Sequence, residues 1–293
     1  MKFLKGLALS LLDFLLFLSL TAFTLVFTLN YTILDPDFAV SQVDRLDVAS
    51  LITEQIQFPP EAQFTSEAID DAIADLEPWM KEQINAGIYS SYDYFAGRSQ
   101  SLSIVISMEP VKESLRDNLR EVFLQSPPPQ LAVLPPAQIE QVFNEFYLGL
   151  SEQIPPTLEF NESLLPPEVM AILEQVRLGF GYFQFAYQAL IGFIVLVILG
   201  IILINRQVKS ITRGIGTTFL IIGAFGLIEI FALTRFIWPQ TAQLGVPLPL
   251  QTWITQLLND FLAPLQMFSI GLLAGGIALL IVSFVYKSRQ ASV

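Results

Sequence analysis

The sequence predicts a mainly α-helical membrane protein. We expect a four-helix transmembrane bundle and a large, mostly helical extracytoplasmic domain, in which two short segments are candidates for a small β-sheet. Four long apolar segments are each about long enough to cross a bilayer as a helix, whereas residues 30–184, between the first two, contain none. Only 14% of the 293 residues are charged, against about 25% in soluble domains. The four apolar segments explain that shortage.

The predicted spans divide the chain into three regions. We expect an N-terminal anchor at residues 1–29, an extracytoplasmic domain at 30–184, and a three-span region at 185–293 with an outer loop at 238–266. A short amphipathic helix in this loop is expected to lie on the membrane surface or beneath the large domain. The spans themselves are Leu7–Leu29, Phe185–Ile204, Thr217–Ile237 and Met267–Tyr286.

The distribution of basic residues predicts the orientation. Basic residues concentrate on the cytoplasmic side of membrane proteins, so we expect a multi-pass protein of the plasma membrane with both termini in the cytoplasm. A cleaved signal peptide is the alternative for the first span, although its apolar stretch is longer than usual and no A-x-A-like site follows it. Three short segments are basic and lack acidic residues: Lys2 and Lys5 before the first span, Arg206, Lys209 and Arg213 between the second and third, and Lys287 and Arg289 after the fourth.

The chain contains neither cysteine nor histidine. Thiolate nucleophiles, Cys/His zinc sites, Ser-His-Asp triads and histidine-ligated haem are therefore excluded. A bound metal would need an all-oxygen shell. Because no catalytic, cofactor or nucleotide signature is present either, we expect a protein that is not an enzyme and holds no cofactor.

Prolines mark the expected helix starts within residues 30–184. In the first turn, the backbone N–H that proline lacks would have no intrahelical partner in any case. The helix that starts at Pro166-Pro167 is expected to continue unbroken into the second span. Ser101–Met108 and Thr157–Phe160 are candidate strands that could pair. The other expected helices start at Glu109-Pro110 and Pro135-Pro136, and a further one covers Ser66–Ala96, where Pro78 kinks or divides it.

Residues 30–184 carry 24 acidic and 7 basic side chains, a net charge of −17. This charge disfavours nucleic acid and anionic lipid headgroups, and it would attract cations or a basic partner. A solvated surface that keeps the domain soluble is the simpler interpretation. Within it, Glu67, Asp71 and Asp75 share one helical face, with Asp70 beside them. A capped, solvated helix or a cation site without a dedicated loop would explain this acidic cluster.

Two acidic residues fall inside predicted spans, where an ionised group costs about 2.5–3.5 kcal/mol on insertion scales. Asp13 lies near the cytoplasmic end of the first span, where water can reach it. Glu229 lies past the middle of the third, and Arg235 follows six residues later on a different helical face. Glu229 could join neighbouring helices by hydrogen bonds, or it could serve a proton- or ion-coupled function.

Small residues indicate close helix packing in two spans. Gly271 and Gly275 form a small-xxx-small pair in the fourth span, and Gly223 and Gly226 give the third span a narrow face. Such residues let helix backbones approach closely. They could serve packing within this chain, or an interface with a second copy or a partner.

The leading functional hypothesis is an accessory or scaffold subunit that binds a membrane or envelope protein through its acidic external domain. The second is a small ion-coupled transporter that uses Glu229 and Asp13, although no inverted repeat is evident. The third is a ligand sensor that signals through a partner, because the cytoplasmic segments are too short for an output module. In all three the chain sits in the lipid bilayer and binds no nucleic acid.

Overall fold

The computed structural model describes residues 2–49, 63–125, 131, 134–205, 207–237 and 248–286, without the side chains of residues 2, 63–70, 248 and 249. The described chain is mainly helical. It forms two compact units. The first, here called the bundle, comprises residues 1–38 and 178–293, and the second, here called the insert, comprises residues 39–177.

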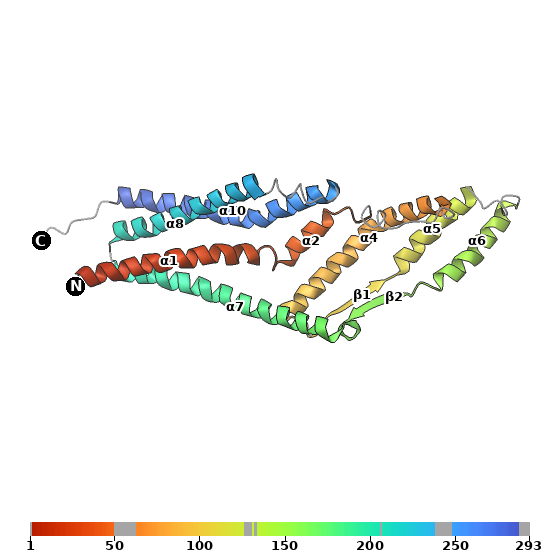
Figure 1. Cartoon of the computed structure of the whole chain (residues 1–293), viewed down its shortest axis with the longest axis horizontal. Coiled ribbons are helices and arrows are strands. Elements are labelled where there is room, and N and C mark those ends of the chain that lie inside the picture. Colours follow the sequence, from red (N-terminus) through yellow and green to blue (C-terminus); the bar gives the residue numbers. More distant parts are fainter. Residues whose placement is uncertain are drawn as a thin grey trace. The chain divides into compact units, whose positions relative to one another are not determined.

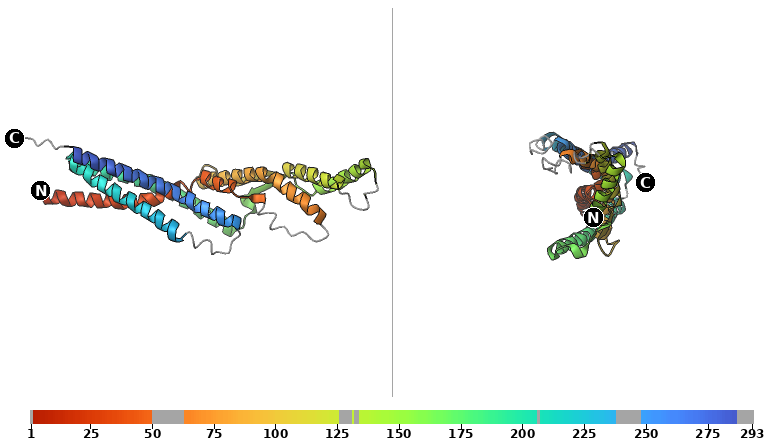
Figure 2. Two further views of the ribbon diagram at one scale, coloured as in Figure 1. Left: turned by 90° about the horizontal axis from the view of Figure 1, so that it is seen from above. Right: turned by 90° about the vertical axis from the view of Figure 1, so that its right-hand side faces the viewer.

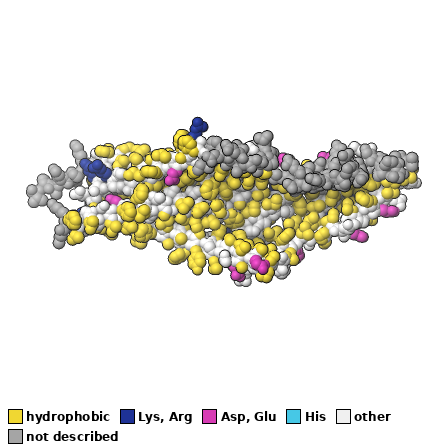
Figure 3. Space-filling model, in the orientation of Figure 1, with side chains coloured by type: hydrophobic (Ala, Val, Ile, Leu, Met, Phe, Trp, Pro, Cys, Tyr) yellow, Lys and Arg dark blue, Asp and Glu magenta, His cyan; other side chains and the backbone are white. Residues whose placement is uncertain are grey.

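Four helices of the described chain are long and apolar enough to cross a membrane. Their outer surfaces carry many exposed hydrophobic side chains, as expected of helices that face lipid (Figure 3). A short π-helical segment, Leu233–Ile237, follows the third of them. The four are α1 (Lys2–Asn30), α7 (Pro167–Ile204), α8 (Val208–Ala232) and α10 (Leu248–Val285).

Successive helices of the bundle run in opposite directions. The N-terminus of α1, the turn from α7 to α8 and the end of α10 therefore lie together at one end of the bundle (Figure 1). The described basic residues Lys5, Lys209 and Arg213 belong to this end, here called the basic end. The fold thus brings together segments that are far apart in the sequence.

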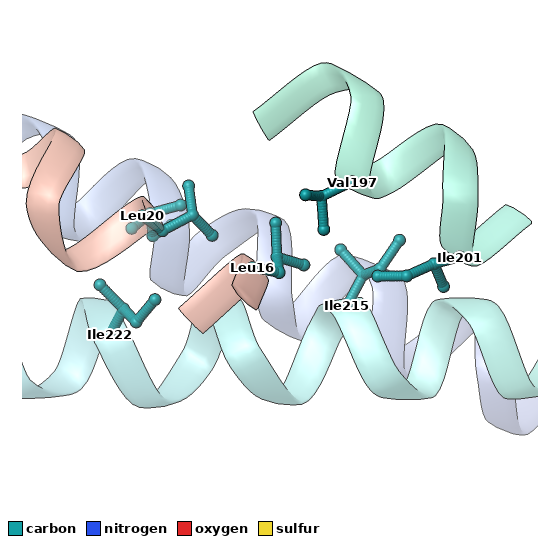
Figure 4. Close-up of a cluster of buried hydrophobic side chains, with 7 residues drawn as sticks. Leu16, Leu20, Val197, Ile201, Ile215 and Ile222 are labelled. Atoms are coloured by element: carbon teal, nitrogen blue, oxygen red, sulfur yellow. The ribbon is translucent and has the colours of Figure 1, made fainter. Parts of the chain in front are cut away.

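A cluster of aliphatic side chains holds the bundle together. Leu16 of α1 is completely buried, and its neighbours come from all three other helices (Figure 4). Lipid tails are as apolar as these side chains, so burial from lipid gives no hydrophobic driving force. Close packing in the cluster therefore stabilises the bundle through dispersion. The remaining members of the cluster are Leu20, Val197, Ile201, Ile215, Ile222 and Leu272.

Two helices of the bundle are longer than the predicted spans. The expected continuity from Pro166-Pro167 into the second span is confirmed, because α7 is one helix of 38 residues. The helix expected in the loop at 238–266 is longer than predicted: α10 begins at Leu248 and runs unbroken through Pro264 into the fourth span. A single proline removes only one helical hydrogen bond, and the rest of the ladder keeps the backbone polar groups satisfied.

The insert is built from helices and one two-stranded sheet. Its helices begin where the prolines predict, so the expected starts at Glu109-Pro110 and Pro135-Pro136 are confirmed. A one-turn 3-10 helix, η2 (Glu162–Leu164), follows the sheet. The helices are α2 (Pro36–Asp44), which begins in the bundle, α4 (Gln63–Phe95), α5 (Glu109–Gln125) and α6 (Pro136–Ser151).

The predicted strands form and pair. β1 (Ser103–Ser107) and β2 (Thr157–Asn161) are antiparallel, with Ile104 opposite Phe160 and Ile106 opposite Leu158. Residues directly opposite each other share a face of the sheet, so these four apolar side chains lie on one side. That side meets α4, where a Cβ on Gly87 would lie 3.5 Å from Ile104 Cδ1.

The predicted helix with Pro78 is bent but not divided. α4 contains Pro78 in its interior and remains one helix of 33 residues, which changes direction along its length (Figures 1 and 2). Proline removes a backbone donor and pushes away the preceding turn, which bends a helix without ending it when the flanking turns are held. Here α5 holds the first half of α4, since Ser114 Oγ donates a hydrogen bond to the Ala72 carbonyl oxygen (3.2 Å).

The core of the insert lies between α5 and α6. Phe143 is completely buried, beside Leu119 and the ring of Phe123, whose centroid is 5.5 Å away. Tyr147 extends this contact, because its hydroxyl donates a hydrogen bond of 2.7 Å to the Lys112 carbonyl oxygen. Aromatic packing therefore joins two helices that are separated in the sequence by Pro127-Pro128-Pro129, which lie outside the described residues.

The alkaline stability of the insert should depend on Tyr147. Burial raises the pKa of its hydroxyl, with smaller contributions from Glu109 and Asp117 that raise it and from Arg116 that lowers it. The hydroxyl of the unfolded chain ionises first, so stability is present below pH 10 and is lost as the pH rises through the raised pKa. Tyr147→Phe should lower stability by about 0.5–1.5 kcal/mol at pH 7 and reduce the loss above pH 10. Thermal unfolding at pH 7–11 tests this, and an unchanged alkaline loss would contradict it.

Candidate functional site

The structure places Asp13 in a small polar pocket near the basic end of the bundle. The pocket has a volume of about 510 Å³ and lies between α1 and α8. Asp13 packs against Gly214, where a Cβ would lie 3.4 Å from Asp13 Oδ1. This oxygen is buried and accepts no hydrogen bond from the described residues. Ser210, Arg213, Thr217 and Thr218 complete the lining.

The Asp13 carboxylate is expected to destabilise the bundle. A half-buried carboxylate without a full set of hydrogen bonds is less favourable than a neutral group of the same shape. We expect Asp13→Asn to stabilise the bundle by about 1 kcal/mol, measured as a higher unfolding temperature of the protein in mild detergent. A lower unfolding temperature would show instead that the carboxylate is paired in the membrane, with Arg213 across the pocket as the first candidate.

Glu229 lies on a different feature, a groove between α1, α8 and α10 with a volume of about 670 Å³. Its lining is apolar apart from Glu229 and three threonines of α1. The Glu229 side chain is exposed, and no hydrogen bond or ion pair joins it to another residue in the described ranges. The expected interhelical hydrogen bond of Glu229 is therefore absent within the part of the chain that the structure describes.

The threonines on this groove satisfy their own hydroxyl hydrogens. Thr21 donates to the Phe17 carbonyl oxygen (2.9 Å), Thr24 to that of Leu20 (2.8 Å) and Thr28 to that of Thr24 (2.9 Å). Such bonds to the preceding turn are typical of threonine inside helices. Each hydroxyl oxygen keeps a free lone pair, so the threonines offer the groove hydrogen-bond acceptors and no donors.

The fold does not bring the charged residues of the spans together. Asp13 contacts Gly214, and Glu229 lies about four turns farther along α8, a rise of roughly 22 Å. Arg235 lies in the π-helical segment, is exposed, and does not line the groove of Glu229. A transport site shared by Asp13 and Glu229 thus finds no support in their positions.

Small residues form the contact between α8 and α10, which lie side by side (Figure 2). A Cβ at Gly223 would come within 2.6 Å of the Ser269 carbonyl oxygen, and one at Gly226 would overlap Ser269 Oγ. Gly275 has only an ordinary contact with Phe219, and a Cβ at Gly271 would meet nothing within 4 Å among the described residues. The close approach of α10 to α8 is made at Gly276 instead.

Sequence reasoning missed the spacing that defines this contact. Gly216 and Gly223 lie seven residues apart on α8, and Ser269, Gly276 and Ser283 repeat at the same interval on α10. A Cβ at Gly276 would lie 2.8 Å from the Gly216 carbonyl oxygen, and Ser283 Oγ donates to the Lys209 carbonyl oxygen (3.1 Å). A seven-residue repeat keeps one seam of each helix facing its partner, so a search for small residues at this interval would have found the contact.

The acidic cluster of α4 does not form a metal site in the described chain. Asp71 and Asp75 are exposed, and Asp75 Oδ2 accepts a hydrogen bond from Asn118 Nδ2 (3.2 Å). The side chains of Glu67 and Asp70 lie outside the described part. Among described side chains, no group of three or more acidic residues is placed to hold a metal ion. The part of the cluster that the structure describes is thus a solvated helix face.

The basic residues of the insert are all engaged within the chain. Arg120 pairs with Glu140 across α5 and α6, and Lys81 pairs with Glu77 (2.8 Å). The Arg177 guanidinium lies 4.7 Å from the centre of the Tyr94 ring. The other four, Arg45, Lys112, Arg98 and Arg116, likewise interact with residues of the chain.

Comparison of the chain with protein-family models, curated protein sequences and solved structures finds no match to any of them. The class of the protein therefore follows from its own features. Four helices that are long and apolar enough to span a bilayer define a membrane protein.

Proposed function

We propose that this chain is a non-enzymatic subunit of a membrane assembly. Its bundle anchors it with the basic end in the cytoplasm, and its insert, on the other side of the membrane, binds a basic protein of the envelope. The observation that carries the proposal is the contrast between the basic and the acidic residues of the insert in the interactions that they make. Its basic residues all interact within the chain, whereas several exposed acidic side chains, among them Glu113, Asp117 and Glu159, have no hydrogen bond or ion pair among the described residues.

The engaged cations serve the fold. Lys81 binds the carbonyl oxygen of Asp44 at the C-terminal end of α2 (3.0 Å), where a positive charge is favourable. Arg177 also donates a hydrogen bond to the Ser99 carbonyl oxygen (3.2 Å). Because these cations already interact with other residues of the insert, they do not compensate its surplus negative charge, which remains on the surface of the insert.

Exposed acidic and exposed apolar side chains occur together on the insert. Glu113 and Asp117 are exposed on α5, and Glu159 is exposed on β2 opposite Val105 of β1, which is 55% exposed. Protein interfaces combine an apolar centre with a charged rim, and complementary charge speeds the encounter of the partners. A basic, partly apolar protein surface fits this combination, whereas a small anion or nucleic acid does not.

Purification of the tagged, full-length protein from its native membranes in mild detergent tests the proposal. We expect a second, basic protein at fixed stoichiometry in low salt, and its release at about 1 M salt, where the Debye length is only about 3 Å. The double variant Glu113→Gln/Asp117→Asn should retain less of it. The matched control Glu113→Asp/Asp117→Glu preserves the charge and should retain it. A protein that purifies alone at every salt concentration would refute the proposal.

A further inference from the structure

The groove of Glu229 is suited in size and place to a small amphiphile. Its volume of about 670 Å³ falls in the range of about 300–1,000 Å³ that is typical of small-molecule sites. It lies in the bundle, between three helices that are long and apolar enough to span a membrane. A ligand can therefore enter it from the lipid phase without passing through water.

The polarity of the groove changes along its length. Phe17, Leu18 and Ile222 line the part nearer the basic end, and Thr28, Glu229 and Leu233 line the part farther from it. On α1 the lining extends from Phe17 to Thr28, a rise of roughly 16 Å. This length suits an alkyl chain that lies along the helices, with its polar head beside Glu229.

The polar groups of the groove select a cationic donor. Glu229 is the only ionisable residue of the lining, and no described residue neutralises it. Thr24 and Thr28 contribute acceptor oxygens only, since their hydroxyl hydrogens are bonded within α1. A primary ammonium has three donors and no acceptor, so it matches this set, whereas a sulfate or phosphate head would be repelled.

We propose that this groove binds a single-chain amphiphile with a primary ammonium head. The ammonium donates hydrogen bonds to the Glu229 carboxylate and to threonine hydroxyl oxygens, and the alkyl chain lies against Phe17, Leu18 and Ile222. The ligand neutralises a carboxylate that is otherwise costly within a membrane. This site is independent of the partner surface proposed for the insert.

Binding of labelled dodecylamine to the purified full-length protein at pH 7, measured by scintillation proximity in a nonionic detergent, tests the proposal. We expect saturable binding at one site per chain. Unlabelled dodecyltrimethylammonium, which lacks N–H donors, should compete more weakly than dodecylamine, and dodecyl sulfate should not compete. Equal competition by dodecyl sulfate would overturn the proposal, because it would show partition into the micelle or a site without charge selection.

Two variants test separately the recognition of the ligand's ammonium head and the fit of its alkyl chain. Glu229→Gln should weaken binding roughly 10- to 100-fold, the value of a charge-assisted hydrogen bond. Ala22→Phe places a ring in the groove from an exposed position and should abolish binding with the carboxylate intact. Asp13→Asn removes the other acid of the spans, in a separate pocket, and should leave binding unchanged. Loss in Ala22→Phe alone would refute ammonium recognition, and loss in neither variant would refute the site.

Discussion

Gly223→Ala is expected to lower the stability of the bundle by about 1–3 kcal/mol, the usual cost of overpacking. The new methyl group would lie 2.6 Å from the Ser269 carbonyl oxygen and 2.8 Å from the Leu273 backbone nitrogen. Both neighbours are backbone atoms, so no side chain can rotate to make room. Helices α8 and α10 would have to separate, which also loses the packing around Ile222. The unfolding temperature of the purified protein in mild detergent measures the effect.

Gly271→Ala is the matched control for this variant. It makes the same chemical change on the facing helix, at a position where nothing in the described structure lies within 4 Å of the added carbon. Alanine favours a helix more than glycine does, so Gly271→Ala should leave stability unchanged or slightly raise it. Equal destabilisation by both variants would contradict the proposed seam. A loss with Gly271→Ala alone would indicate that its open face contacts a second copy or a partner.

Phe143→Ala is expected to cost the insert about 3–5 kcal/mol, as large-to-small changes at buried aromatic residues do. Phe143 is completely buried between α5 and α6, and its ring packs on Phe123 and on Tyr147, 5.5 and 6.0 Å away between centroids. This loss is a large part of the 5–15 kcal/mol that stabilises an ordinary domain. Hydrogen exchange of the full-length protein should increase in α5 and α6, with the bundle helices remaining protected.

Leu148→Ala is the control on the same helix. Leu148 is 60% exposed, so its truncation leaves no cavity and should change stability by no more than about 0.5 kcal/mol. If Phe143→Ala and Leu148→Ala gave the same exchange pattern, the core of the insert would not lie between α5 and α6. A specific effect of Leu148→Ala on partner retention, without loss of stability, would place the partner surface on this face of α6.

Local sequence patterns predicted most of the secondary structure. The apolar runs set the four long helices, because an unbroken helix is how a single apolar segment satisfies its backbone in lipid. The prolines at 110, 136 and 167 indicated helix starts, and alternation around Ile104 indicated β1. The continuation of α10 through Pro264 escaped prediction, because flanking turns can hold a helix across a proline.

The candidate sites were less accessible to sequence reasoning. Asp13 and Glu229 stood out because charged residues are rare in apolar segments. The distance between them depends on the register of α1 against α8, because Asp13 lies on α1 and Glu229 lies on α8. The small-xxx-small pattern singled out Gly271 and Gly275, yet the closest approach to α8 is at Gly276. The groove of Glu229 has no local signature at all, since its lining comes from three helices.

The sequence by itself determined that this is a helical membrane protein with an acidic segment between its first and second spans, because hydropathy, helix length and net charge are local sums over residues. Only the tertiary structure decided which glycines lie in the seam, that Phe143 rather than Phe146 is buried, and that Glu229 faces an apolar groove with acceptor oxygens. These depend on the rotation and register of each helix against its neighbours. Both are set by the summed packing of side chains distant in sequence, which no local pattern specifies.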